Sequence, residues 1–169
     1  MVWNGQSDVF PWARADADPF EQPEGPADTV FVNEFNCVGR SCSPSSCCVR
    51  RSPSSFAWAQ DTGAARFKPS ALSWSQLSKQ GSDDAARAAY DLNLAVGQCP
   101  ADAIHWVTPR QRERLEGITR DAVDGTTDRA AAAGELFELL AKAAFENGRA
   151  AAPAMKRKSK RSGQYVDWF

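Results

Sequence analysis

Short runs of apolar and β-branched residues predict four strands in the middle of the chain. Residues 29–32 form the run Thr-Val-Phe-Val, and residues 104–107 form a similar run, Ile-His-Trp-Val. Phe and Trp alternate with small residues over positions 56–59, and an Asp-Thr-Gly turn then leads into residues 64–67. Such a pair of runs around a glycine-containing turn predicts a β-hairpin.

Three later segments have the spacing of amphipathic helices. A helix is expected over residues 82–96, with Ser82 or Asp83 as its N-cap. Thr108 and Pro109 have the N-cap and first-turn residue types that open a second helix, and Gly125 ends it. A third helix should run from about Thr127 to Asn147–Gly148, with Pro153 closing the ordered part. The pattern therefore predicts a small α+β unit followed by helices.

Both ends of the chain resemble docking segments. Residues 1–28 are acidic, interrupted by four prolines, and carry bulky aromatic side chains that a solvated linker has no reason to expose: Trp3, Phe10, Trp12 and Phe20. Residues 151–169 hold five basic side chains followed by an aromatic end. That basic run could be a solvated tail, a contact for an acidic protein or lipid surface, or a nuclear-targeting signal.

Composition narrows the possible functions. The 169 residues are enough for one domain, and no run approaches the roughly 18 apolar residues that a membrane span requires. A formal net charge of -1 argues against a dedicated nucleic-acid binder. His105 is the only histidine, and its place in an apolar strand predicts a surface or hydrogen-bonded side chain and not a ligand. Because no carboxylate pair, phosphate loop or dinucleotide motif occurs, the chain is not expected to be an enzyme.

The five cysteines give the sharpest chemical signal. Four of them, Cys37, Cys42, Cys47 and Cys48, lie close together, whereas Cys99 is remote and precedes Pro100. A 4Fe–4S centre commonly takes three thiolates from one loop and a fourth, followed by proline, from elsewhere. A four-cysteine zinc site, disulfides, or no metal at all remain alternatives.

Two stretches around these cysteines carry a family resemblance. Residues 30–39 (Val-Phe-Val-Asn-Glu-Phe-Asn-Cys-Val-Gly) and residues 98–109 (Gln-Cys-Pro-Ala-Asp-Ala-Ile-His-Trp-Val-Thr-Pro) resemble the single-cluster 4Fe–4S ferredoxin domain of chloroplast proteins of the DnaJ-ferredoxin type. The resemblance covers about residues 29–120, and the proline and hairpin positions of that family match Pro53, Phe56, Gly63, Ala65 and Arg66. No J domain is included, because the chain lacks a His-Pro-Asp tripeptide.

The resemblance implies a fold and a set of ligands. The fold is α+β: a small ferredoxin-like core of short antiparallel strands plus helices in residues 29–120, then a helix region in residues 121–150, with the 1–28 arm and the 151–169 tail as extensions. The family's tight cysteine run is expanded by five residues here, so Arg40 stands at its second-ligand position. The implied cluster ligands are Cys37, Cys42, Cys48 and Cys99, with Cys47 as a substitute for Cys48.

Two functional hypotheses follow from the resemblance and the extensions. In the first, the chain is an iron-sulfur electron-transfer protein without a substrate pocket, bound as an accessory subunit of a chloroplast photosynthetic complex such as photosystem I. In the second, it is a cluster-less scaffold that stabilises a thylakoid membrane assembly. Both place it on the stromal side of the thylakoid, peripheral to the membrane, with protein subunits as partners through its aromatic termini and basic tail. A redox protein is a further partner if the cluster is present, and no nucleic acid is expected.

Overall fold

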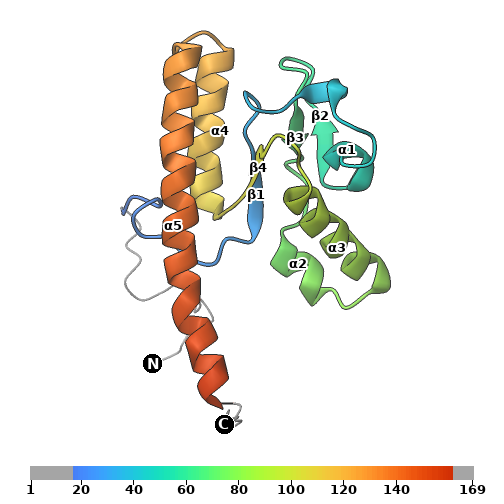
Figure 1. The fold of residues 1–169 in the computed structure, drawn as a ribbon, viewed down its shortest axis with the longest axis vertical. Helices are drawn as coiled ribbons and strands as arrows, with labels where there is room; N and C mark the ends of the chain where they lie inside the picture. The colour runs from blue at the N-terminus through green and yellow to red at the C-terminus, as the bar shows by residue number, and fades with distance from the viewer. Residues whose placement is uncertain (1–16, 162–169) are drawn as a thin grey trace, which may run out of the picture.

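The computed structural model describes the backbone of residues 17–161 and the side chains of residues 17–151. The part described is a mixed α+β fold with two small antiparallel sheets, as the sequence predicts (Figure 1). Its elements follow in the order β1 (Thr29–Val32), η1 (Gly39–Ser41), α1 (Cys48–Arg51), β2 (Phe56–Trp58), β3 (Ala65–Phe67), α2 (Trp74–Lys79), α3 (Asp83–Gly97), β4 (Ile104–Val107), α4 (Pro109–Val123) and α5 (Arg129–Arg161).

Each sheet consists of two strands. β2 and β3 form the expected hairpin, with Phe56 opposite Phe67. β1 pairs with the remote strand β4, and the register runs from Thr29 opposite Val107 to Val32 opposite Ile104. This second pairing closes the long loop that contains every element from η1 to α3.

Strand β1 lies between two hydrophobic cores. Val30 and Val32 point into a core formed with β2, β3, α2, α3 and Ile104. Phe31, which points to the opposite face, packs with Val107 and with residues of α4 and α5. All four residues of β1 are consequently buried, and Figure 1 shows the strand running between the α4–α5 pair and the remaining elements.

Side-chain caps fix where the helices begin. Ser82 accepts a hydrogen bond from the amide of Ala85 and starts α3, while Thr108 and Gln111 form a capping box at the start of α4. Both N-caps agree with the sequence-based expectation. The short helix α2 was not expected, although Ser73 and Gln76 form a capping box at its start.

The last helix is longer than the sequence pattern suggests. It does not end at Asn147–Gly148, nor does Pro153 stop it, because α5 continues to Arg161. Alanines at positions 150, 151, 152 and 154 supply the strongest helix-forming residue on both sides of the proline. The helix end expected at Asn147–Gly148 is therefore wrong, and the basic run belongs to the end of this helix.

The acidic arm is bound to its own chain over residues 17–28. Phe20 is completely buried in the core that α4 and α5 share, and the guanidinium of Arg114 lies over its ring. The carboxylate of Glu24 accepts hydrogen bonds from the Thr108 hydroxyl (2.7 Å) and the Arg110 amide (2.8 Å) at the start of α4. The other aromatic residues of the two proposed docking segments, Trp3, Phe10, Trp12, Tyr165, Trp168 and Phe169, lie outside the described residues.

Among the residues that the structure describes, no helix combines the length and the apolar character needed to cross a membrane.

Replacing Phe20 by Ala tests whether the arm is part of the fold. The substitution removes a fully buried ring, so we expect the free energy of unfolding in urea to fall by about 3–5 kcal/mol. Phe145→Ala is the matched control, because the Phe145 ring is largely exposed and its loss should change stability by less than about 0.5 kcal/mol. Equal effects of the two substitutions would contradict the burial of Phe20.

Candidate functional site

The β1–β4 pairing brings the two cysteine-bearing segments together. Asn33 follows β1 and donates its backbone N–H to the carbonyl of Ala103, which precedes β4 (2.7 Å). The carbonyl of Asn33 in turn accepts the N–H of Cys37 (3.1 Å). Cys37 and Cys99 therefore leave the same end of one sheet, although they are far apart in sequence.

All five cysteines line one narrow cavity at this end of the sheet. Cys37 comes from the segment after β1, Cys42 and Cys47 from the loop before α1, Cys48 from α1 itself, and Cys99 from the turn before β4. The remaining lining residues are Val32, Val38, Gly39, Ser46, Trp58, Ala65, Pro100, Ala101, Ala103 and Ile104. Every cysteine is a free thiol. The structure thus gathers all the cysteines proposed as ligands from the sequence.

Backbone amides point at two of the sulfur atoms. The Sγ of Cys37 accepts the N–H groups of Gly39 and Ala65, each at 3.4 Å. The Sγ of Cys99 accepts the N–H of Ala103, also at 3.4 Å. Such hydrogen bonds stabilise a thiolate more than a thiol, and around iron–sulfur clusters they help to set the reduction potential.

Burial raises the pKa of two thiols of the cavity in the metal-free chain, those of Cys42 and Cys48. The pKa of the Cys48 thiol is raised to about 12, mainly by burial, and the neighbouring Cys47, Cys37 and Cys99 contribute in the same direction. The pKa of Cys42 is also raised, mainly by burial, although a hydrogen bond with Ser46 opposes the change. A metal that binds here must therefore displace protons.

The donor chemistry of the cavity suits a thiolate-bound metal centre, but its space is small. About 20 Å³ of the cavity admits water, which is room for about one molecule. Among the described residues, no three His, Cys, Asp or Glu side chains lie close enough to grip one metal ion. The cavity also has no histidine or carboxylate in its lining. The cavity therefore offers the right type and number of ligand atoms for a metal group, but it does not contain the space that such a group needs.

Glycine and arginine contacts hold the loop that carries the cysteines. Gly39 has a φ of +62°, and a Cβ on it would lie 2.8 Å from the carbonyl oxygen of Gly63 in the β2–β3 turn. The guanidinium of Arg40 lies 5.4 Å from the ring centre of Trp58. Arg51 donates to the carbonyl of Ser45 (2.7 Å) across the loop. The loop is therefore anchored both to the hairpin and to its own far side.

His105 does not join the cysteine cavity. It is half-buried opposite Phe31 in the β1–β4 sheet, and burial lowers its pKa despite the opposing charge of Asp102. Trp58 and Trp106 are partly buried and pack against the first core. Trp58 also lines the cysteine cavity.

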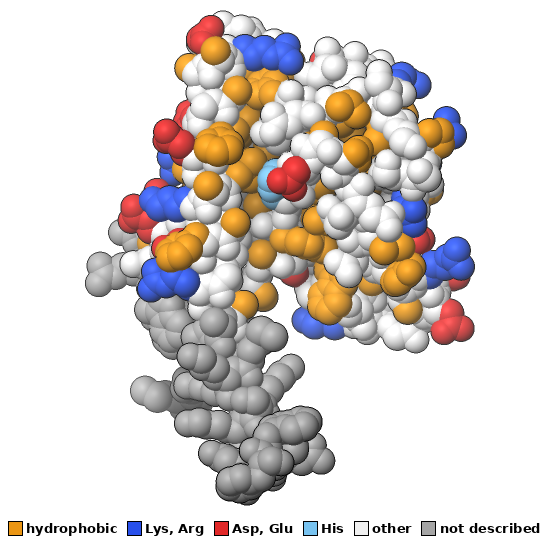
Figure 2. Space-filling model, in the orientation of Figure 1, with side chains coloured by type: hydrophobic (Ala, Val, Ile, Leu, Met, Phe, Trp, Pro, Cys, Tyr) orange, Lys and Arg blue, Asp and Glu red, His pale blue; other side chains and the backbone are white. Residues whose placement is uncertain are grey.

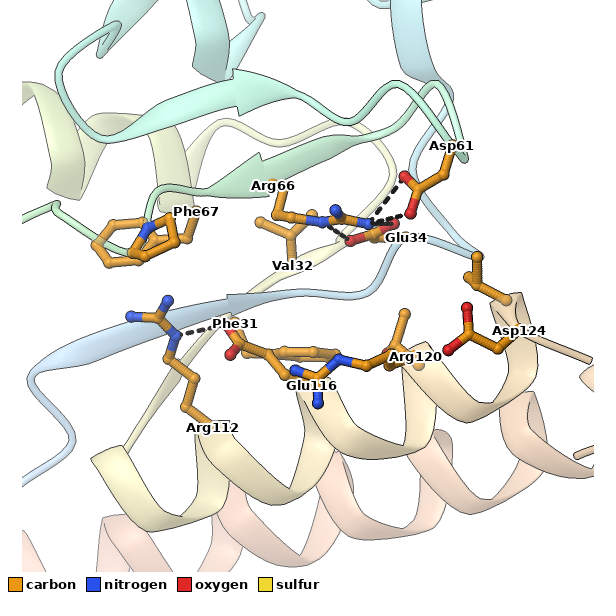
Figure 3. A pocket seen from close by; sticks show the side chains of 13 residues that line it. Phe31, Val32, Glu34, Asp61, Arg66, Phe67, Arg112, Glu116, Arg120 and Asp124 are labelled. Carbon is orange, nitrogen blue, oxygen red and sulfur yellow. Dashed lines mark hydrogen bonds and ion pairs between the residues drawn. The ribbon is translucent and has the colours of Figure 1, made fainter. Parts of the chain in front are cut away.

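A second cavity of about 330 Å³ lies between β1, the hairpin and α4 (Figure 3). Glu34 and Asp61 project toward Arg66 from one wall, and Arg66 binds both carboxylates. On the α4 wall Arg112 contacts Glu116 at 2.7 Å. The carboxylates of Glu34, Asp61 and Glu116 are thus neutralised within the cavity.

Asp124 is a fourth carboxylate in the lining of this second cavity, whose other polar groups are mostly engaged in contacts with one another. Its lining holds no histidine, cysteine or lysine, and the hydroxyl of its single threonine, Thr119, donates to the carbonyl of Leu115. The side chain of Glu34 is 5% exposed and also accepts a hydrogen bond from Thr62, so its oxygens are already occupied. Its ion pairs tie the hairpin to the end of β1, beside the cysteine segment.

No protein-family model, no curated protein and no solved structure matches the chain. The resemblance to the DnaJ-ferredoxin type therefore stays a prediction from the residues that carry it.

Gly39→Ala tests the close approach of the cysteine loop to the hairpin. The new methyl group would meet the Gly63 carbonyl and would sit in a backbone region that costs an L-residue about 1–2 kcal/mol. We expect a larger fall in the free energy of unfolding than for Gly63→Ala. Gly63 also has a positive φ (+70°), but a Cβ added to it would meet no other atom. Equal losses, measured in urea, would mean that only the backbone conformation matters.

The raised pKa of Cys48 predicts how stability depends on pH. Above pH 9 the unfolded chain releases the Cys48 proton while the folded chain retains it, so the free energy of unfolding should fall as the pH rises from 9 toward 12. In metal-free Cys48→Ala the fall should be shallower. Parallel curves for the two chains would show that Cys48 does not titrate in this way.

Proposed function

We propose that the chain is a ferredoxin-like electron-transfer protein that holds one 4Fe–4S cluster on Cys37, Cys42, Cys48 and Cys99. The observation that carries the proposal is the convergence of a cysteine loop and a remote Cys-Pro on one apolar cavity. The amides directed at the sulfurs of Cys37 and Cys99 support it further.

The arrangement of the cysteines along the chain favours a cluster over a single zinc ion. Structural zinc sites usually take their thiolates in pairs with two to four residues between them, whereas Cys99 has no other cysteine near it in the sequence. A 4Fe–4S cluster commonly takes three thiolates from one loop and a fourth from elsewhere.

The chain's own residues would serve such a centre in three ways. When bound, the cluster takes up and releases one electron at a time. The N–H groups of Gly39, Ala65 and Ala103 stabilise negative charge on the ligand sulfurs. Apolar side chains of Val32, Trp58 and Ile104 limit the access of water, which otherwise alters the potential.

We further propose that the protein works as an accessory subunit of a larger assembly, for which a chloroplast photosynthetic complex on the stromal side of the thylakoid is the candidate. The cluster-less scaffold is the second candidate function. Exposed aromatic rings on α5 favour a role in assembly, since the Phe137 and Phe145 side chains are 73% and 63% exposed. Figure 2 shows hydrophobic side chains on the face of this helix that is turned toward the viewer.

Metal analysis of the anaerobically purified chain tests the cluster. We expect about four irons and equivalent sulfide per chain, with a visible charge-transfer band. Cys37→Ser and Cys99→Ser should lose most of the band, whereas Cys47→Ser should retain it.

The variants and the metal content together separate the alternatives. A colourless chain with one zinc would overturn the electron-transfer function in favour of a structural site. A folded chain without any metal would overturn the electron-transfer function and support the cluster-less scaffold. If Cys47→Ser loses the band and Cys48→Ser keeps it, Cys47 and not Cys48 is the cluster ligand.

A further inference from the structure

The segment that forms the cysteine cavity is basic, although the whole chain is slightly acidic. From residue 35 to residue 60 the sequence contains Arg40, Arg50 and Arg51 and no Asp or Glu. The chain as a whole carries a formal net charge of -1. Positive charge is therefore concentrated in the segment that supplies four of the five thiols.

Two of these arginines present their charge to solvent. Arg40 and Arg50 are exposed, and neither has an ion-pair partner among residues 17–151. Arg51 is half-buried and binds Ser45 within the loop. In Figure 2 basic side chains stand at the upper right, over α1 and the segment before it.

Three carboxylates lie near the basic segment, but none of them lines the cavity. Glu34 and Asp61, which flank the segment, share one partner, Arg66. Asp102 is exposed near Cys99 and keeps its negative charge, because the neighbouring His105 has a lowered pKa and is neutral at pH 7. No acidic side chain lines the cavity.

Two exposed apolar side chains also belong to the lining of the cysteine cavity. Val38 is 50% exposed and Pro100 is exposed, and both line the cavity. Apolar contact over a redox centre brings a partner close, while surrounding charges of one sign steer and orient its approach. This combination is typical of a transient docking surface.

From this charge distribution we propose that Val38, Pro100, Arg40 and Arg50 form the docking surface for a redox protein whose own contact surface is acidic. The inference rests on the proposed electron-transfer function and adds the chemistry of the partner. With the cluster bound and reduced, the exchange would consist of one electron passing to the metal of the partner, with no proton or bond transferred.

Electron transfer to two acceptors of opposite charge tests the docking surface. The reduced chain is mixed in a stopped-flow instrument with an acidic blue-copper protein, in which Cu(II) becomes Cu(I), or with a basic cytochrome c, in which Fe(III) becomes Fe(II). We expect the second-order rate constant with the copper protein to fall as ionic strength rises, because salt screens attraction between exposed charges. The rate constant with cytochrome c should rise or stay constant.

Charge-removing variants locate the effect. At low ionic strength the double variant Arg40→Gln/Arg50→Gln should slow electron transfer to the copper protein about three- to tenfold and accelerate transfer to cytochrome c. Arg87→Gln is the matched control, since Arg87 is a highly exposed arginine on α3 with only a 3.9 Å contact to Asp91. It should leave both rates nearly unchanged.

The outcomes separate this inference from the function on which it rests. A coloured, iron-containing chain whose rates do not respond to Arg40→Gln/Arg50→Gln, or respond equally to Arg87→Gln, overturns the docking surface alone. A rate with the copper protein that increases with salt does the same. An iron-free, colourless chain overturns the electron-transfer function itself.

Discussion

The pairing of β1 with β4 is the interaction on which the other features depend. It joins the two cysteine-bearing segments through the Asn33–Ala103 hydrogen bond, and it places apolar side chains on both faces of one strand. Val30 and Val32 pack in the core that also contacts Cys37, Cys48 and Cys99, whereas Phe31 packs in the core formed with α4 and α5. A break in this short ladder would therefore separate the thiols and expose both cores.

The helical half of the molecule supports this sheet from the side opposite α3. α4 starts directly after β4, and its N-terminus is capped by Thr108 and by Glu24 from the N-terminal arm. Gln111 is fully buried and connects the arm to α5, donating to the Pro19 carbonyl and exchanging hydrogen bonds with Asn147. The arm is thus bound in place mainly by directional polar contacts and by the Phe20 ring. Its acidic composition matches the positive end of the helix that it covers.

Much of the local structure follows from the sequence, because capping residues and alternation act over short distances. Ser82, Thr108 and the Phe56–Phe67 hairpin were predictable for that reason. The burial of Phe20 and the charge network of Glu34, Asp61 and Arg66 were not, since they depend on segments that approach only in the folded chain. The continuation of α5 through Pro153 does not follow from the general rule that proline ends a helix, because it depends on the alanines on both sides of this proline.

The candidate site was predictable in its residue types but not in its surroundings. The Cys-Pro at positions 99 and 100 suggested the remote ligand, and the structure brings it to the cavity. The amides of Ala65 and Ala103 were invisible in the sequence, because every residue but proline carries such a donor and only the fold directs it at a sulfur.

The long sequence separation between β1 and β4 also has a consequence for how the protein folds during synthesis. The partner strand of β1 is synthesised much later, so the β1–β4 ladder closes only after α3 has left the ribosome. Until then the four thiols of the loop cannot meet Cys99. A cofactor that uses Cys99 as a ligand would accordingly be acquired only after β4 has been synthesised, and not by the isolated loop.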